Sequence, residues 1–192
     1  GVKSDSWAFN DARASLADII FAQGKWGKAL EIYTQIERDL ATDPATFEKY
    51  FSSNLNWVVA QFNTGNIEAA ATTAENIYER NKSLLGEKHY VTAEALGLLA
   101  ATQIVTKDEK AALSNFRDSV PILVSRSHQS QGKQDAEGIK NQRLGLILES
   151  YIYLLSKIGG TSLEREADFD VISEAFRIAD LSRGRSVQSA LN

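Results

Sequence analysis

Few side chains in this sequence are of the types that carry out chemistry. Its 192 residues hold no cysteine and only two histidines, His89 and His128, and neither belongs to a metalloprotease-like pairing with a glutamate. The stretch Gly159-Gly160-Thr161-Ser162 lacks the lysine of a phosphate-binding loop. The acidic pair Asp168 and Asp170 lies where a helix is expected to begin, and a helix start favours acids without catalysis. The sequence therefore predicts no catalytic residue, no cofactor and no metal site, and His89 is interpreted as a structural residue at a helix start.

Charge and hydropathy exclude two further classes of partner. The chain carries 21 basic and 25 acidic side chains, a formal net charge of −4, which gives no general field for attracting nucleic acid. No apolar run reaches the roughly 18 residues of a membrane span, so no membrane partner is predicted. The lack of cysteine leaves the compartment open, with the cytoplasm slightly favoured and an exported parent allowed. There is also no methionine, and we expect a fragment of a longer protein.

The composition points to helices. Only 2 of the 192 residues are proline, and alanine is abundant, so helix breakers are scarce and good helix formers are common. The sequence therefore predicts an all-α fold.

A repeat organises these helices. The segment from Ala22 to Tyr33 is answered by the segment from Asn63 to Ala74, 41 positions further on, and more weakly by the segment from Val105 to Phe116, a further 42 positions on. Each copy joins two apolar-periodic stretches through a short turn, which is typical of a helical hairpin. In the first copy Gly24 fits the helix stop, because glycine enters the left-handed conformation without steric cost.

Four such hairpins account for the whole chain. We predict them at about residues 6–41, 44–85, 90–127 and 136–191, within a single domain spanning residues 1–192. Asp43 and Pro44 are expected to begin the second hairpin as an N-cap residue followed by a first-turn proline. One hairpin cannot bury its apolar face alone, so the hairpins are expected to stack into a short right-handed α-α superhelix, or solenoid, with a concave side.

The hairpins resemble the tetratricopeptide repeat (TPR). The glycine, aromatic, alanine and aromatic positions of that motif fall on Gly24, Trp26, Ala29 and Tyr33. The period of 41 to 42 is similar to the longer variety of this repeat, and Lys107 and Glu109 depart from the motif in the third unit. This resemblance implies a non-enzymatic scaffold that binds a protein or peptide, or another domain of the same parent chain, in its concave face. It also implies a regulatory or targeting arm of a larger bacterial signalling protein.

The segment from Glu174 to Leu191 is similar to the helix that joins such repeats to a caspase-like CHAT domain in bacterial proteins. This second resemblance implies an alternative, in which the chain is the N-terminal part of a CHAT-type cysteine peptidase whose catalytic domain lies after Asn192. Arg183 and Arg185 would then hold the domain junction through fork-shaped contacts to carboxylates, unless they form a solvated face. A third alternative is a structural oligomerisation scaffold.

The TPR pattern also implies which residues line the concave face. The same positions have a second interpretation, in which Phe21, Phe62 and Ile104 simply pack between helices. The predicted peptide-binding residues are Asp11, Asp18, Phe21, Leu55, Val59, Phe62, Asn63, Glu94, Ala101 and Ile104.

Overall fold

The chain is all-helical, as predicted. The computed structural model describes residues 7–126, 134–167 and 169–191, and of residues 126, 134–137 and 184–191 only the backbone is described. In these ranges there are ten helices and no strand. The helices are α1 (Trp7–Ala22), α2 (Trp26–Asp39), α3 (Pro44–Tyr50), α4 (Leu55–Asn63), α5 (Ile67–Leu85), α6 (Tyr90–Val105), α7 (Glu109–Arg126), α8 (Gln134–Ile158), α9 (Ser162–Ala167) and α10 (Val171–Leu191).

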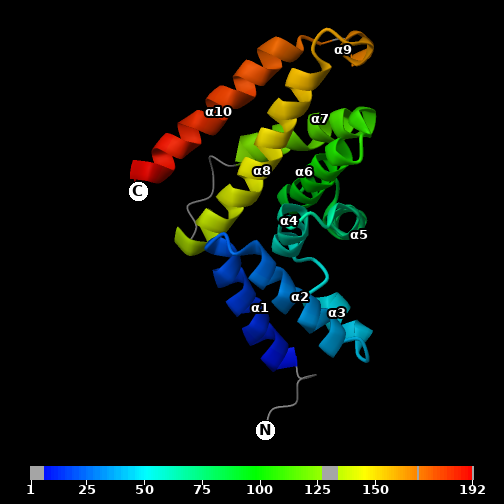
Figure 1. Cartoon of the computed structure of the whole chain (residues 1–192), viewed down its shortest axis with the longest axis vertical. Coiled ribbons are helices and arrows are strands. Elements are labelled where there is room, and N and C mark those ends of the chain that lie inside the picture. The colour runs from blue at the N-terminus through cyan, green and yellow to red at the C-terminus, as the bar shows by residue number, and fades with distance from the viewer. Residues whose placement is uncertain (1–6, 127–133, 168, 192) are drawn as a thin grey trace.

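Consecutive helices pack in pairs. Helix α1 packs on α2, α4 on α5 and α6 on α7, and neighbouring pairs meet where α2 touches α4 and α5 touches α6 (Figure 1). The predicted hairpins 6–41, 44–85 and 90–127 contain these three pairs. One main core runs through all of them, and a small second core of Ile36, Leu40 and Phe51 lies at the end near α3.

The three turns between paired helices have the same hydrogen bonds. At the first, Gly24 N–H donates to Phe21 O (2.8 Å) and Lys25 N–H to Ile20 O (3.2 Å), which is a Schellman helix end. Equivalent pairs of bonds recur 41 and 83 positions further on, around Gly65 and Lys107. The alanines that follow each turn, Ala29, Ala70 and Ala112, are fully buried. The repeat in the sequence is therefore a repeat in the structure.

Lys107 makes the third turn without a glycine. Its φ of 66° is in the left-handed region, where Gly24 and Gly65 lie at 71° and 81°, and a side chain is strained there. We expect Lys107→Gly to raise the free energy of unfolding by about 1 kcal/mol, measured by urea denaturation. Lys107→Ala removes the same charge but keeps a Cβ, so it should bring no gain. Equal gains in both variants would show that charge, not backbone strain, limits this turn.

The first helix of the second unit is broken in two. The sequence predicts one run from Asp43 to Gly65, and Asp43 does cap a helix through its bond from Thr46 N–H (3.1 Å). The chain then leaves the helix at Phe51 and re-enters it after Asn54, whose side chain accepts from Asn56 N–H (2.9 Å). An asparagine that bonds the backbone in this way favours a helix start over a helix interior, which explains the break.

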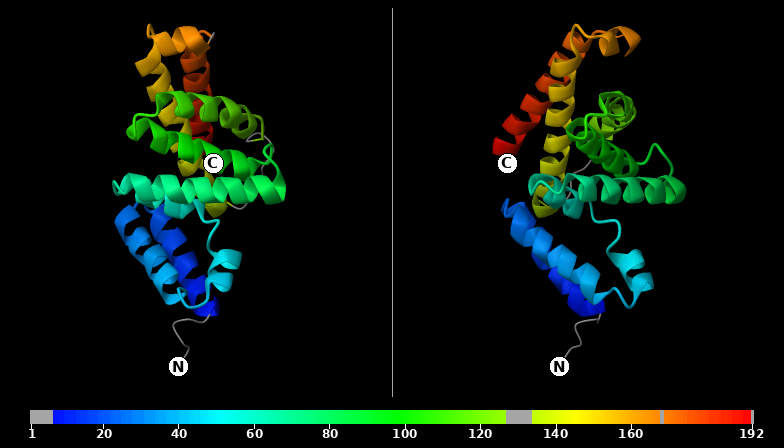
Figure 2. Two further views of the ribbon diagram at one scale, coloured as in Figure 1. Left: turned by 90° about the vertical axis from the view of Figure 1, so that its right-hand side faces the viewer. Right: turned by 45° about the vertical axis from the view of Figure 1, so that its right-hand side comes forward.

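The last three helices, α8 to α10, are arranged differently from the first three pairs. Helices α5 to α7 lie across the long axis of the molecule, whereas α8 runs along it (Figure 2). After Gly159 and Gly160 the chain forms the short helix α9 and returns as α10, which packs on α8. The predicted segment 136–191 thus contains three helices, and its first helix takes a direction of its own.

Candidate functional site

Helix α8 lies lengthwise over the first three pairs. Going along it, Gln142 Nε2 donates to Ala22 O at the end of α1 (3.0 Å), and Ile147 packs on Gly97 in α6. Further on, the Tyr151 ring stacks on Phe116 of α7 with centroids 5.0 Å apart. The face of α1, α4 and α6 that carries α8 is called the inner face below.

Arg143 anchors α8 to this face. Its Nε donates to Glu94 Oε1 (2.8 Å) and its Nη2 to Glu94 Oε2 (3.2 Å), which is a two-pronged contact between guanidinium and carboxylate. The two side chains are 11% and 2% exposed, so this is a buried ion pair. Two charges out of water are tolerated only when each satisfies the other, so the pair defines how α6 and α8 meet.

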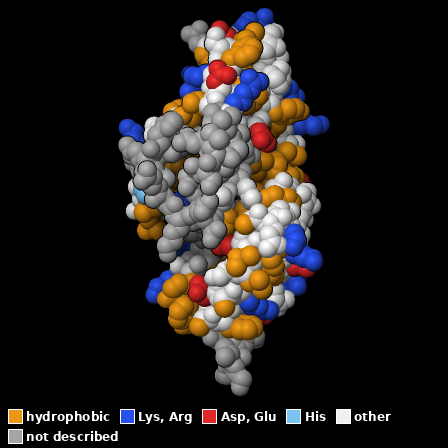
Figure 3. Space-filling view, turned by 90° about the vertical axis from the view of Figure 1, so that its left-hand side faces the viewer, with side chains coloured by type: hydrophobic (Ala, Val, Ile, Leu, Met, Phe, Trp, Pro, Cys, Tyr) orange, Lys and Arg blue, Asp and Glu red, His pale blue; other side chains and the backbone are white. Residues whose placement is uncertain are grey.

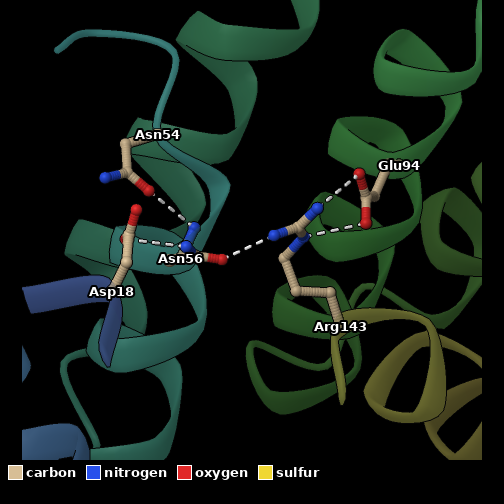
Figure 4. Close-up of polar contacts among 5 residues, drawn as sticks. All are labelled: Asp18, Asn54, Asn56, Glu94 and Arg143. Carbon is tan, nitrogen blue, oxygen red and sulfur yellow. Dashed lines mark hydrogen bonds and ion pairs between the residues drawn. The ribbon is translucent and has the colours of Figure 1, made fainter. Parts of the chain in front are cut away.

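The remaining donor group of the guanidinium, Nη1, bonds to a residue of α4. Arg143 Nη1 donates to Asn56 Oδ1 (2.6 Å), and Asn56 Nδ2 in turn donates to Asp18 Oδ1 (2.8 Å) (Figure 4). The Tyr33 hydroxyl donates to the same oxygen of Asp18 (2.6 Å). We call Asp18, Tyr33, Asn56, Glu94 and Arg143 the inner cluster, which joins α1, α2, α4, α6 and α8.

The Tyr33 hydroxyl of the inner cluster is held in its protonated form. Burial, and next the hydrogen bond to Asp18, raise the pKa of the Tyr33 hydroxyl well above its usual range. Tyr33 therefore stays protonated and donates to Asp18 at all ordinary pH values. Every charged group of the cluster is engaged with another member, which suits a clamp between helices and leaves no free nucleophile or proton donor within it.

The predicted concave-face residues are placed in four groups. Asp18 and Glu94 belong to the inner cluster, Phe62 is half-buried against the main core, and Asp11 and Asn63 are exposed. The remaining five, Phe21, Leu55, Val59, Ala101 and Ile104, are buried. Of the two predicted junction residues, Arg183 is exposed and the side chain of Arg185 lies outside the described residues.

Sequence reasoning missed Arg143 and Asn56. A usable signal was present, because Glu94 is the only charged residue between Tyr90 and Val105, a stretch with no polar side. A carboxylate in such a helix must have a buried partner. Arg143 is in turn four residues before Ile147, on the apolar side of its own helix, so the two charges could have been paired from the sequence.

One of the two histidines lies within the described residues. His89 is the N-cap of α6, and its Nδ1 accepts from Val91 N–H (3.3 Å), which confirms its interpretation as a helix-start residue. His128 lies outside the described residues. Across residues with described side chains, no three His, Cys, Asp or Glu residues gather closely enough to hold a metal ion. No helix in the described ranges is long and apolar enough to span a membrane.

Comparison with known proteins does not identify a family for this chain. No protein-family model matches the chain, and no curated protein matches it. The function must therefore be argued from the repeated turns, the inner face and the surface of the molecule.

Proposed function

We propose that this chain is a non-enzymatic, TPR-like scaffold whose inner face binds a helix, and that α8 is the helix bound there. In this proposal the three helix pairs are units of a right-handed superhelix. Within a larger protein the module would act as a regulatory or targeting arm. The observation that carries the proposal is the path of α8, which contacts α1, α4, α6 and α7 in succession along a face made by repeated units.

The contacts of α8 support helix recognition of a specific kind. Its buried residues Leu144, Ile147, Tyr151 and Leu154 fall at helical spacing on one side, with Arg143 as the polar anchor. Amphipathic helices bind apolar grooves through such a pattern of anchors. Gly97 in α6 lets the backbone of α6 approach Ile147 closely, since a Cβ there would lie 2.9 Å from Ile147 Cγ2. The inner face thus combines apolar contact with one position that selects arginine.

The proposal predicts that the occupant can be exchanged once it is no longer tethered. A protease site placed between residues 127 and 133 of the full chain would separate α8 to α10 from the helix pairs after folding. We expect the two pieces to stay together and a fluorescent copy of residues 134–192 to replace the resident piece, as measured by fluorescence anisotropy. The same copy with Arg143→Ala should bind at least about 100-fold more weakly, because Glu94 would stay buried without its counter-charge.

A matched control uses Lys157→Ala, which removes a half-exposed ion pair with Glu109 at the far end of α8. This copy should bind within a few-fold of the original. Unfolding of the chain on cleavage, seen as loss of the far-UV circular dichroism signal, would contradict the proposal. It would mean that α8 is an inseparable part of the core and that the inner face binds nothing else.

A further inference from the structure

The outer side of α1 is apolar and exposed. Leu16 and Ile19 are 50% and 58% exposed, and Phe9, about two turns before Leu16 on the same side, is 38% exposed. Hydrophobic side chains with a few charges among them gather on the lower part of the face in Figure 3, where α1 lies. We call Phe9, Leu16 and Ile19 the α1 stripe.

The repeat shows what normally covers these positions. The residues 41 positions after Leu16 and Ile19 are Trp57 and Ala60, and both are buried. The Trp57 ring faces Tyr33 of α2, with centroids 6.3 Å apart, so the second helix of one unit covers the first helix of the next. Leu99 and Thr102 of α6, which lie 83 positions after Leu16 and Ile19, are also buried. Here α6, the first helix of its unit, packs against α5, the second helix of the unit before. The α1 stripe is therefore half of a unit-to-unit contact.

The other half is exposed at the opposite end of the chain. Helix α10 is the second helix of the last unit, and it lies on the side of α8 that faces away from α6 and α7 (Figures 1 and 2). Its residues Ile172 and Phe176, one helical turn apart, are 63% and 68% exposed. Helix α10 is therefore a second helix with an exposed apolar side, the kind of element that would cover the α1 stripe.

We propose that copies of this chain join head to tail, with α10 of one copy packed antiparallel on α1 of the next. The antiparallel direction is taken from the corresponding contact within the chain, between α5 and α6. These helices are joined by a short turn and so run in opposite directions. With Phe176 opposite Leu16, Ile172 reaches Ile19. Arg183, seven residues or roughly 10 Å further along α10 and on the same side as Phe176, then comes beside Phe9.

This contact differs from a symmetric dimer in one testable way. It joins two different faces, so each copy keeps one unused face and the assembly grows with concentration. The inner face takes no part in it, and the proposal does not depend on the exchange of α8.

The test is sedimentation velocity of the full chain over a concentration series. We expect the average mass to rise with concentration, and Leu16→Glu and Phe176→Glu each to abolish the rise. Because each variant keeps the face that the other lacks, an equal mixture of the two should give a complex of two chains that grows no further. Leu84→Glu changes a residue as exposed as Phe176 but remote from both faces on α5, so it should assemble like the unmodified chain.

Asp11 provides a second control. It is exposed but lies two residues after Phe9, on the other side of α1, so Asp11→Arg should leave assembly unchanged. Far-UV circular dichroism would establish that every variant is folded. A chain that stays monomeric at all concentrations would overturn the proposal. Association that survives Phe176→Glu would also overturn it, since it would show that the α1 stripe pairs with itself or with another surface.

Discussion

Glu94→Leu is expected to lower the free energy of unfolding by about 3–5 kcal/mol, because it leaves Arg143 buried without its counter-charge. Arg143 would retain one bond, to Asn56 Oδ1, and its Nε and Nη2, which donate to Glu94, would lose their acceptor. Urea unfolding at neutral pH, followed by far-UV circular dichroism, measures the loss.

The double variant Glu94→Leu with Arg143→Met should recover most of that stability. Replacing both members of a buried ion pair by apolar residues is often neutral, and here the residual loss is the bond to Asn56, about 1 kcal/mol. Lys110→Leu serves as the surface control, since its pair with Glu166 is largely exposed and should contribute less than about 1 kcal/mol. A loss below 1 kcal/mol for Glu94→Leu would show that water reaches Arg143 and that the inner cluster does not hold α8.

The local features of the fold were predictable because they depend on neighbouring residues. A glycine after an apolar helix predicts a helix end, and Gly24 and Gly65 have the positive φ that this requires. Asp43 before Pro44 predicts a helix start, and the side chain of Asp43 caps it. The small residues Ala29, Ala70 and Ala112 occupy the same position after each turn of the repeat, and all three are fully buried. Each inference needs only a few consecutive positions.

The path of α8 was not predictable in this way. Its apolar periodicity predicts a helix with one buried side, and a fourth stacked hairpin would satisfy that pattern as well as a helix lying along the inner face. The choice depends on pairings between distant positions, Arg143 with Glu94 and Ile147 with Gly97. One sequence shows each of these residues but not which of them meet.

Gly97→Ala is the sharpest test of that path. Its effect on the free energy of unfolding should have the opposite sign to the effect expected in an isolated helix. In an isolated helix, alanine in place of glycine is favourable by about 1 kcal/mol. At Gly97, however, the new Cβ would lie 2.9 Å from Ile147 Cγ2 and 3.1 Å from Ile147 Cδ1, and Ile147 is fully buried and branched at Cβ. We therefore expect Gly97→Ala to destabilise the chain by about 1–3 kcal/mol in urea unfolding.

Ile147→Ala removes the obstructing methyl groups and on its own should lower the free energy of unfolding by about 2–5 kcal/mol. In that background Gly97→Ala should become stabilising by about 1 kcal/mol, because the helix gain remains and the clash is gone. Gly145→Ala in α8 is the matched control, since a Cβ there meets nothing within 4 Å and should stabilise in either background. If Gly97→Ala alone stabilises the chain as Gly145→Ala does, α6 and α8 do not pack closely at this residue.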